Sequence, residues 1–220
     1  MDEDLERAWQ DVLAAWGEGD RHKRFLVLAE AYPHVKLFIE TKHPVPSGGK
    51  VEVAVRDELA YFGLDRPDTF AESRAVMMSF SVMAVRRFRQ LAPQVPTVQL
   101  RERRNVLKSW PAEGFGAQLM GPSIGAIRAR PWLVDYWRSR GMGTYCWTVD
   151  DPADLLLCRD LGIEWVGTNV PSRALTVLDG AGKNGAAGET GETGAVGGGV
   201  VSGGADGATG ASGAAGAVGL

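Results

Sequence analysis

Long hydrophobic runs are absent from this sequence, and that absence bounds its class. No apolar stretch approaches the roughly 18 residues that a membrane-spanning helix needs, so we expect no membrane span. The amino-terminal segment MDEDLERAWQ is acidic, whereas a secretory signal would be basic and then apolar. The chain as written is therefore expected to be cytoplasmic.

An excess of charge of one sign is also missing. The chain has 24 basic and 27 acidic residues, and its last 42 positions contribute one lysine and four of the acids. The remaining part is balanced, so no field of one sign favours nucleic acid or an acidic membrane as a partner. We expect no nucleic-acid partner.

Cysteine and histidine are scarce, with two and three residues respectively. Cys146 and Cys158 show no CxxC spacing and no neighbouring histidine, so they do not form a metal cage. We expect both to be ordinary buried thiols.

Glycine, by contrast, is abundant but confined, since 16 of the 29 glycines lie from Gly180 onward. Residues 179–220 contain glycine at every third position, as in collagen, where only glycine fits at the triple-helix axis. This tail has no proline, and its two blocks of triplets are out of phase. We expect it to be disordered because it has little to bury; a trimer is the alternative.

Apolar strand-like segments alternate with helix-like segments between residues 21 and 178. Residues 1–20 form a separate amphipathic helix in this interpretation, with Trp9 and Trp16 on its apolar face, and a second helix covers 21–31. Six strands are predicted, within VKLFIETK, RAVMMSF, PTVQL, GAQLMGPS, GTYCWTV and IEWVGTN. Uniformly apolar strands separated by helices indicate an α/β fold with a covered parallel sheet.

Such a sheet is either doubly wound or a (β/α)₈ barrel. Polar residues and a tryptophan fall at the carboxyl ends of the strands, where both architectures bind ligands. Glu40 and Lys42 are two residues apart, so a continuous strand would direct both side chains to one face. The alternative for such a pair is a surface ion pair of little consequence.

Several segments resemble, in order and spacing, the second half of the glycerophosphodiester phosphodiesterases, which are (β/α)₈ barrels. These segments are LFIETKHP, MMSFS, RQLAPQVPTVQL, MGPSIGAIRARPWLVDYWRSRGM and YCWTVDDPADLLLCRDLGIEWVGTNVPSRAL. The resemblance implies a TIM-type barrel that is incomplete, with about six of eight strands. It also implies metal-assisted hydrolysis of glycerophosphodiesters to an alcohol and glycerol 3-phosphate.

The resemblance further assigns roles to four residues. Glu40 matches a ligand of a divalent cation, Ca²⁺ or Mg²⁺, and Lys42 matches a catalytic residue that faces the phosphate. Trp147 and Ser79 match substrate-binding positions. Two alternatives stay open, because Trp147 can pack in the core and Ser79 can satisfy a backbone group in a turn.

The family's amino-terminal motifs are missing. Family members carry H-R-G and E-x-D at the ends of their first two strands and use a histidine pair as general acid and base; none of these motifs is present. His43 follows Lys42 but matches no catalytic position. We therefore expect two open sheet edges, weak metal affinity and little activity from this truncated chain.

Two alternatives to a damaged enzyme remain. The chain could serve as a noncatalytic interaction or scaffold protein with a collagen-like tail, or as a fragment that pairs with a separate amino-terminal half.

Overall fold

The computed structural model describes residues 32–44, 49–102, 116–185, 199–204 and 216–219. The two helices expected within residues 1–31 lie outside this range.

Six parallel strands form the core of the sheet, and each pairs with the next in chain order. They are β1 (Leu37–Glu40), β2 (Ala75–Ser79), β3 (Thr97–Arg101), β4 (Leu119–Pro122), β5 (Gly143–Cys146) and β6 (Trp165–Thr168). This order confirms the predicted α/β fold with six strands of a TIM-type barrel, and it excludes the doubly wound alternative, whose strand order would reverse.

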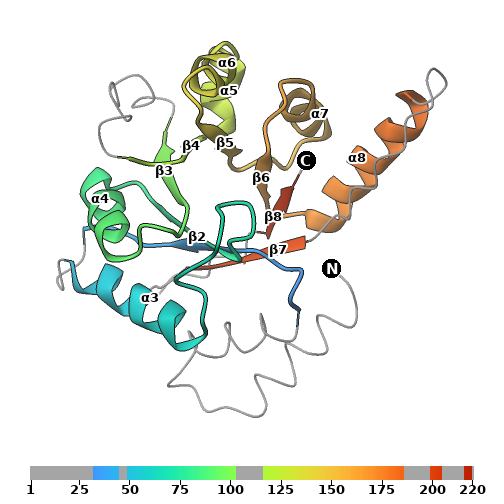
Figure 1. Ribbon diagram of the computed structural model, residues 1–220. Coiled ribbons are helices and arrows are strands. Elements are labelled where there is room, and N and C mark those ends of the chain that lie inside the picture. Colours follow the sequence, from blue (N-terminus) through green and yellow to red (C-terminus); the bar gives the residue numbers. More distant parts are fainter. Residues whose placement is uncertain (1–31, 45–48, 103–115, 186–198, 205–215, 220) are drawn as a thin grey trace.

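Helices separate most of these strands and lie outside them, around the ring (Figure 1). They are α3 (Lys50–Tyr61), α4 (Val82–Leu91), α5 (Ile124–Ala129), α6 (Leu133–Arg138), α7 (Pro152–Asp160) and α8 (Pro171–Gly185). None of the described helices has both the length and the apolar character that crossing a membrane requires.

Two helices begin at side-chain caps that the sequence indicates. Asp151 precedes Pro152, and its carboxylate accepts the Ala153 backbone N–H at 2.8 Å, which fixes the start of α7. Ser81 accepts the Ala84 N–H at 3.2 Å at the start of α4. These caps place each helix directly after the loop that leaves the carboxyl end of a strand.

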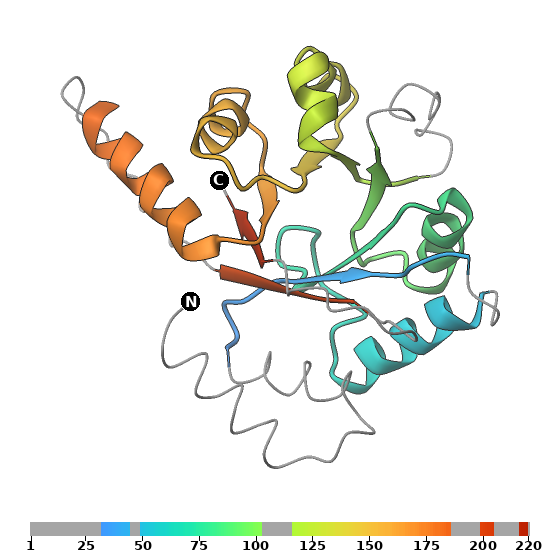
Figure 2. The ribbon, with the colours of Figure 1, turned by 180° about the vertical axis from the view of Figure 1, so that it is seen from behind.

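The glycine-rich tail departs from the expectation of disorder in the two segments that the structure describes beyond α8. Its residues form β7 (Gly199–Gly204) and β8 (Gly216–Gly219), which lie beside the ends of the six-stranded sheet (Figure 2). β7 pairs with β1 in parallel, β8 pairs with β6 antiparallel, and the two pair with each other, so the barrel is closed. The prediction of two open edges is therefore wrong, because unpaired backbone groups of β1 and β6 are satisfied by tail strands.

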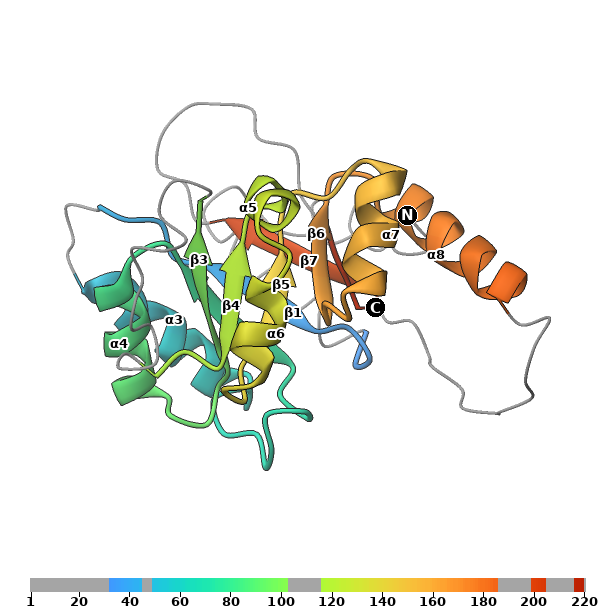
Figure 3. The ribbon, with the colours of Figure 1, turned by 90° about the horizontal axis from the view of Figure 1, so that it is seen from above.

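Helix α8 also extends to Gly185, beyond residue 179, where the tail was predicted to begin. The barrel is irregular where the tail strands close it, between β6 and β1 (Figure 3). There β8 is antiparallel to both β6 and β7, whereas β1 to β6 are parallel to one another. Pairing with existing edges needs only backbone groups, so segments of Gly, Ala, Val and Ser can join a sheet without large side chains to bury.

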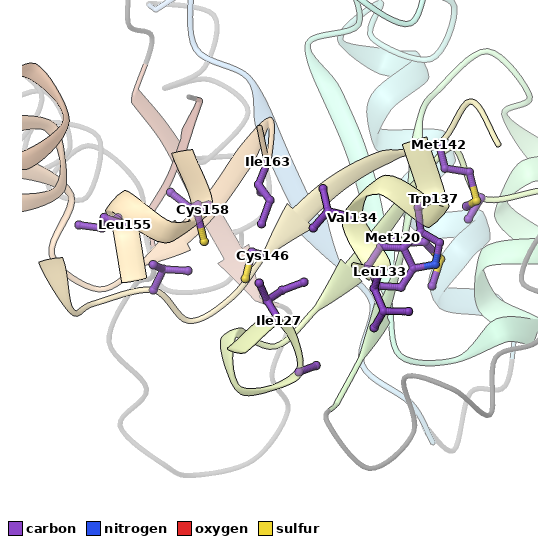
Figure 4. Packing of buried hydrophobic residues seen from close by; sticks show 14 of the residues in the cluster. Met120, Ile127, Leu133, Val134, Trp137, Met142, Cys146, Leu155, Cys158 and Ile163 are labelled. Atoms are coloured by element: carbon purple, nitrogen blue, oxygen red, sulfur yellow. The ribbon is translucent and has the colours of Figure 1, made fainter. Parts of the chain in front are cut away.

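The buried apolar side chains divide by the face of the strand that carries them. Outward-facing residues such as Met120, Cys146 and Val166 pack against α5, α6 and α7, in the cluster of Figure 4. A second outer cluster packs β1 and β2 against α3 and α4. Cys146 and Cys158 are both buried and free, as predicted.

The inward faces fill the barrel with a separate cluster. It contains Phe38, Val76, Met78, Val98, Leu100 and Tyr145, with Leu119, Trp147 and Trp165 packed against them. Layers of side chains that fill the interior are typical of a TIM-type barrel. The layers also define the direction in which Glu40 points.

Candidate active site

Glu40 is the last residue of β1 and belongs to the inward face of the barrel. Phe38, two residues earlier, packs in the barrel interior and stacks on Tyr145 of β5 with ring centroids 5.2 Å apart. Because side chains alternate along a strand, Glu40 lies on the same face as Phe38 and one layer nearer the carboxyl end. Glu40 is half-buried there.

The electrostatics agree with this placement. Burial raises the pKa of Tyr145 above its ordinary value, and the negative charge of Glu40 raises it further. This direction agrees with the placement of Tyr145 in the barrel interior and of Glu40 on the inward face of β1. Glu40 therefore supplies negative charge at the mouth of the interior.

Lys42 lies two residues past Glu40 and is exposed. The structure ends β1 at Glu40, earlier than the strand expected through Lys42. The backbone still follows the sheet at the next residue, since Thr41 donates its N–H to the Met78 carbonyl at 2.9 Å. Lys42 thus lies at the carboxyl end of β1, at the rim of the barrel.

Trp147 follows β5 and is partly buried at the same rim. Its indole N–H donates to the Gly121 carbonyl at 2.8 Å, and its ring meets Phe80 edge-on, with centroids 5.2 Å apart. Phe80 follows Ser79 in the MMSFS segment but was not among the predicted site residues, and it is 39% exposed. The two rings form an aromatic pair, so Trp147 both packs and contributes to the rim.

Ser79 is fully buried at the end of β2. Its hydroxyl donates to the Thr41 carbonyl at 2.7 Å and accepts the Ser81 N–H at 3.1 Å. These two bonds match the predicted alternative to substrate binding, in which Ser79 satisfies backbone groups in a turn. The substrate-binding role of Ser79 stays a prediction.

Asp150 after β5 forms a compact polar cluster with Thr168, the last residue of β6, and with Asn169, which follows it. Asp150 accepts hydrogen bonds from the Thr168 hydroxyl at 2.9 Å and from the Asn169 backbone and side chain at 2.8 Å each. Arg173 donates to the Asp150 carbonyl. Burial acts to raise the pKa of Asp150, but the hydrogen bonds from Asn169 and Thr168 and the charge of Arg173 outweigh it and lower the pKa.

His43 takes no part in the interior. Its Nε2 lies 2.6 Å from the Glu52 carboxylate on α3, outside the barrel. His34, the other described histidine, precedes β1 at the opposite end of the strand and contacts the Tyr32 ring edge-on. Among the described residues, therefore, no histidine pair faces the rim as a general acid and base.

A divalent cation needs more ligands than the described residues offer. Ca²⁺ and Mg²⁺ take six or more oxygen ligands, several of them carboxylates or water. In the part of the chain that the structure describes, no three His, Cys, Asp or Glu side chains lie together as a metal site would require. The described residues do not fit a metal centre, and the cation stays an expectation from the resemblance.

Sequence reasoning missed Glu52, which is fully buried. One signal was present: Glu52 lies three and seven residues before Val55 and Leu59, which belong to the apolar face of the same helix. An acid on an apolar face is expected to have a buried partner.

The model of the "Glycerophosphoryl diester phosphodiesterase family" matches residues 20–173. Two curated relatives from Mycobacterium tuberculosis strains, both named "Probable glycerophosphodiester phosphodiesterase 1", are each 43% identical over 151 residues. That alignment covers 69% of this chain and 55% of the relatives, so the chain spans little more than half their length.

Solved structures of phosphodiesterases share the fold of this chain. A glycerophosphodiester phosphodiesterase from Parabacteroides distasonis aligns with a TM-score of 0.61 at 19% identity, over 73% of this chain and 64% of that one. A phosphodiesterase from Oleispira antarctica, solved with the product sn-glycerol-3-phosphate, aligns with a TM-score of 0.61 at 14% identity, over 72% and 60% of the two chains. On the match to the family model and to relatives at 43% identity, this chain belongs to the glycerophosphoryl diester phosphodiesterase family.

Proposed function

We propose that the rim of this barrel binds the phosphoryl group of a glycerophosphodiester, with Lys42 as the cation that meets it. The observation that carries the proposal is the position of Lys42, at the carboxyl end of β1 and two residues past the inward-facing Glu40. Ligands of TIM-type barrels bind at this end of the strands. Membership in the phosphodiesterase family supplies the substrate class.

The chemistry of each group suits that ligand. A lysine ammonium is a compact point charge that can offset the charge on nonbridging phosphate oxygens. Phe80 and Trp147 provide an aromatic surface at the same rim, which can cover the apolar part of the alcohol. Glu40 can accept a hydrogen bond from a glycerol hydroxyl or contribute one oxygen ligand to a cation.

Hydrolysis by this chain alone is expected to be slow. Each missing general acid or base lowers the rate by about 10² to 10⁴, and the described residues present no histidine pair at the rim. With Glu40 as the one predicted ligand, we expect weak affinity for Ca²⁺ or Mg²⁺.

Binding of sn-glycerol 3-phosphate, measured by isothermal titration, tests the proposal. Lys42→Met keeps most of the side-chain volume but removes the charge, so we expect affinity to fall by about tenfold, the loss of one charge-assisted contact. Lys50→Met is the matched control, because Lys50 is an exposed lysine at the start of α3. Equal affinity in the wild type and Lys42→Met would contradict the proposal.

The same preparation gives the activity test. Release of glycerol 3-phosphate from glycerophosphocholine, with Mg²⁺ or Ca²⁺ added, is expected to stay near the uncatalysed background. Turnover at the usual enzyme range of about 1 to 10³ per second would show that this expectation is wrong.

A further inference from the structure

A buried carboxylate outside the barrel holds the turn that follows β1. Glu52 in the first turn of α3 has a fully buried side chain, and its carboxylate has two basic partners. His43 Nε2 lies 2.6 Å from Oε1, and the Arg87 guanidinium on α4 lies 3.3 Å from both carboxylate oxygens. An ionised carboxylate only accepts hydrogen bonds, so His43 donates through Nε2.

These three residues are closely packed as well as paired. The side chain of His43 is 11% exposed and that of Arg87 is 35% exposed. A Cβ on Gly49, the residue before α3, would lie 3.1 Å from Arg87 Cδ and Nε, so the backbone here approaches the guanidinium closely. A buried carboxylate that lost these partners would be left uncompensated, at a high free-energy cost.

Thr41, the residue before Lys42, is also fixed by hydrogen bonds. Thr41 donates its N–H to the Met78 carbonyl at 2.9 Å, and its own carbonyl accepts the Ser79 hydroxyl at 2.7 Å. Lys42 therefore lies between Thr41, bonded to β2, and His43, bonded to Glu52 of α3. The two attachments are independent, because they involve different elements.

We propose that Glu52 is a positioning residue for Lys42, acting through His43 with Arg87 as its counter-charge. An exposed lysine on a loose turn would sample many directions, and ordering it on binding costs free energy. A backbone fixed on both sides of Lys42 removes part of that cost in advance. The purpose of this arrangement rests on the proposed phosphate-binding role of Lys42, but the arrangement itself can be tested without a ligand.

The first test follows Lys42 directly in the full chain. The lysines are converted to ¹³C-dimethyl-lysine, and the Lys42 signal is identified by its loss in Lys42→Arg. In Glu52→Gln we expect this signal to narrow and to move toward its position in the unfolded chain. Asp57→Asn is the matched control, since Asp57 is an exposed acid on the same helix paired with Arg56. An unchanged Lys42 signal in Glu52→Gln would overturn the inference.

If Glu52→Gln fails to fold, as judged by circular dichroism, Arg87→Gln replaces it, because Arg87 is more exposed and leaves Glu52 its His43 partner. The expected change in the Lys42 signal is the same in direction and smaller. An unchanged signal in a folded Arg87→Gln would likewise overturn the inference.

A second test uses sn-glycerol 3-phosphate and separates positioning from a general loss of structure. We expect Glu52→Gln to weaken binding by about fivefold in the presence of Lys42, and by much less in a Lys42→Met background, since coupled residues are non-additive. Equal weakening in both backgrounds would contradict positioning. If the wild type does not bind this ligand, the proposed function fails, while the Lys42 signal still decides the inference.

Discussion

At the scale of single residues, the rim combines groups that the sequence identifies with groups that it does not. Glu40, Lys42 and Trp147 lie at strand ends, where their spacing in the sequence places them. Phe80 joins them at the rim through its contact with the Trp147 ring, and Glu52 lies outside the barrel in contact with His43. The chemical character of the rim therefore depends on neighbours that are distant in the chain.

Asp150 gives a prediction at this scale that depends on pH. Its folded-state pKa is lowered from 3.8, so its hydrogen bonds stabilise the fold fully above that value and are lost as the pH falls below it. We expect Asp150→Asn to lower the free energy of unfolding by about 1 kcal/mol at pH 7. The difference from the wild type should shrink below pH 3.8, where the wild-type carboxylate becomes protonated.

Urea unfolding at a series of pH values measures this effect. Asp68→Asn is a suitable control, because Asp68 is exposed. A difference between wild type and Asp150→Asn that stayed constant from pH 7 to pH 3 would refute the role given to the carboxylate.

At the scale of elements, the strands of the barrel require particular side-chain sizes at particular layers. Tyr145 on β5 fills the interior beside β6, where Gly167 has no side chain. A Cβ on Gly167 would lie 2.3 Å from the Tyr145 hydroxyl oxygen and 3.1 Å from Cζ. The glycine is therefore required by the tyrosine on the neighbouring strand.

Gly167→Ala is accordingly expected to destabilise the fold by about 1 to 3 kcal/mol, the usual cost of overpacking a core. Adding Tyr145→Phe removes the clashing oxygen and should recover part of the loss. Thermal unfolding of the single and double variants measures both effects. Gly143→Ala on β5 is the control, because its nearest contact would be an ordinary 3.4 Å. A double variant no more stable than Gly167→Ala would argue against this clash.

At the scale of the whole molecule, the barrel is closed by strands from the tail. β7 and β8 cover the edges of β1 and β6, which would otherwise offer unpaired backbone groups to other chains. This closure was not expected from composition, because backbone pairing leaves no signal in a stretch of Gly, Ala and Val.

A chain shortened to end at Gly198 lacks β7 and β8 and should expose both edges. We expect it to associate or precipitate at concentrations where the full chain stays in solution, because exposed strand edges pair with one another. Sedimentation velocity of the two chains at matched concentrations compares them. Identical sedimentation would show that the tail strands do not protect the edges. The same measurement on the full chain tests the alternative of a trimer through the tail.

Much of the fold was predictable because its signals are local. Alternating apolar strands and amphipathic helices gave the six-stranded sheet, and Asp151 followed by Pro152 marked the start of α7. Ser79 illustrates the limit: its position at a strand end suggested ligand binding, whereas its hydroxyl lies between two backbone groups. The choice between these roles depends on the position of Thr41, which no local pattern contains.

By itself, the sequence determined the order of strands and helices, the family, and the presence of an acid and a lysine at the end of β1, because periodicity and short motifs are properties of neighbouring residues. Only the tertiary structure decided that the tail strands close the barrel, that Phe38 stacks on Tyr145 inside it, and that Glu52 pairs with His43. These are contacts between segments far apart in the chain. They form because buried charges and unpaired backbone groups must find partners wherever the fold supplies them.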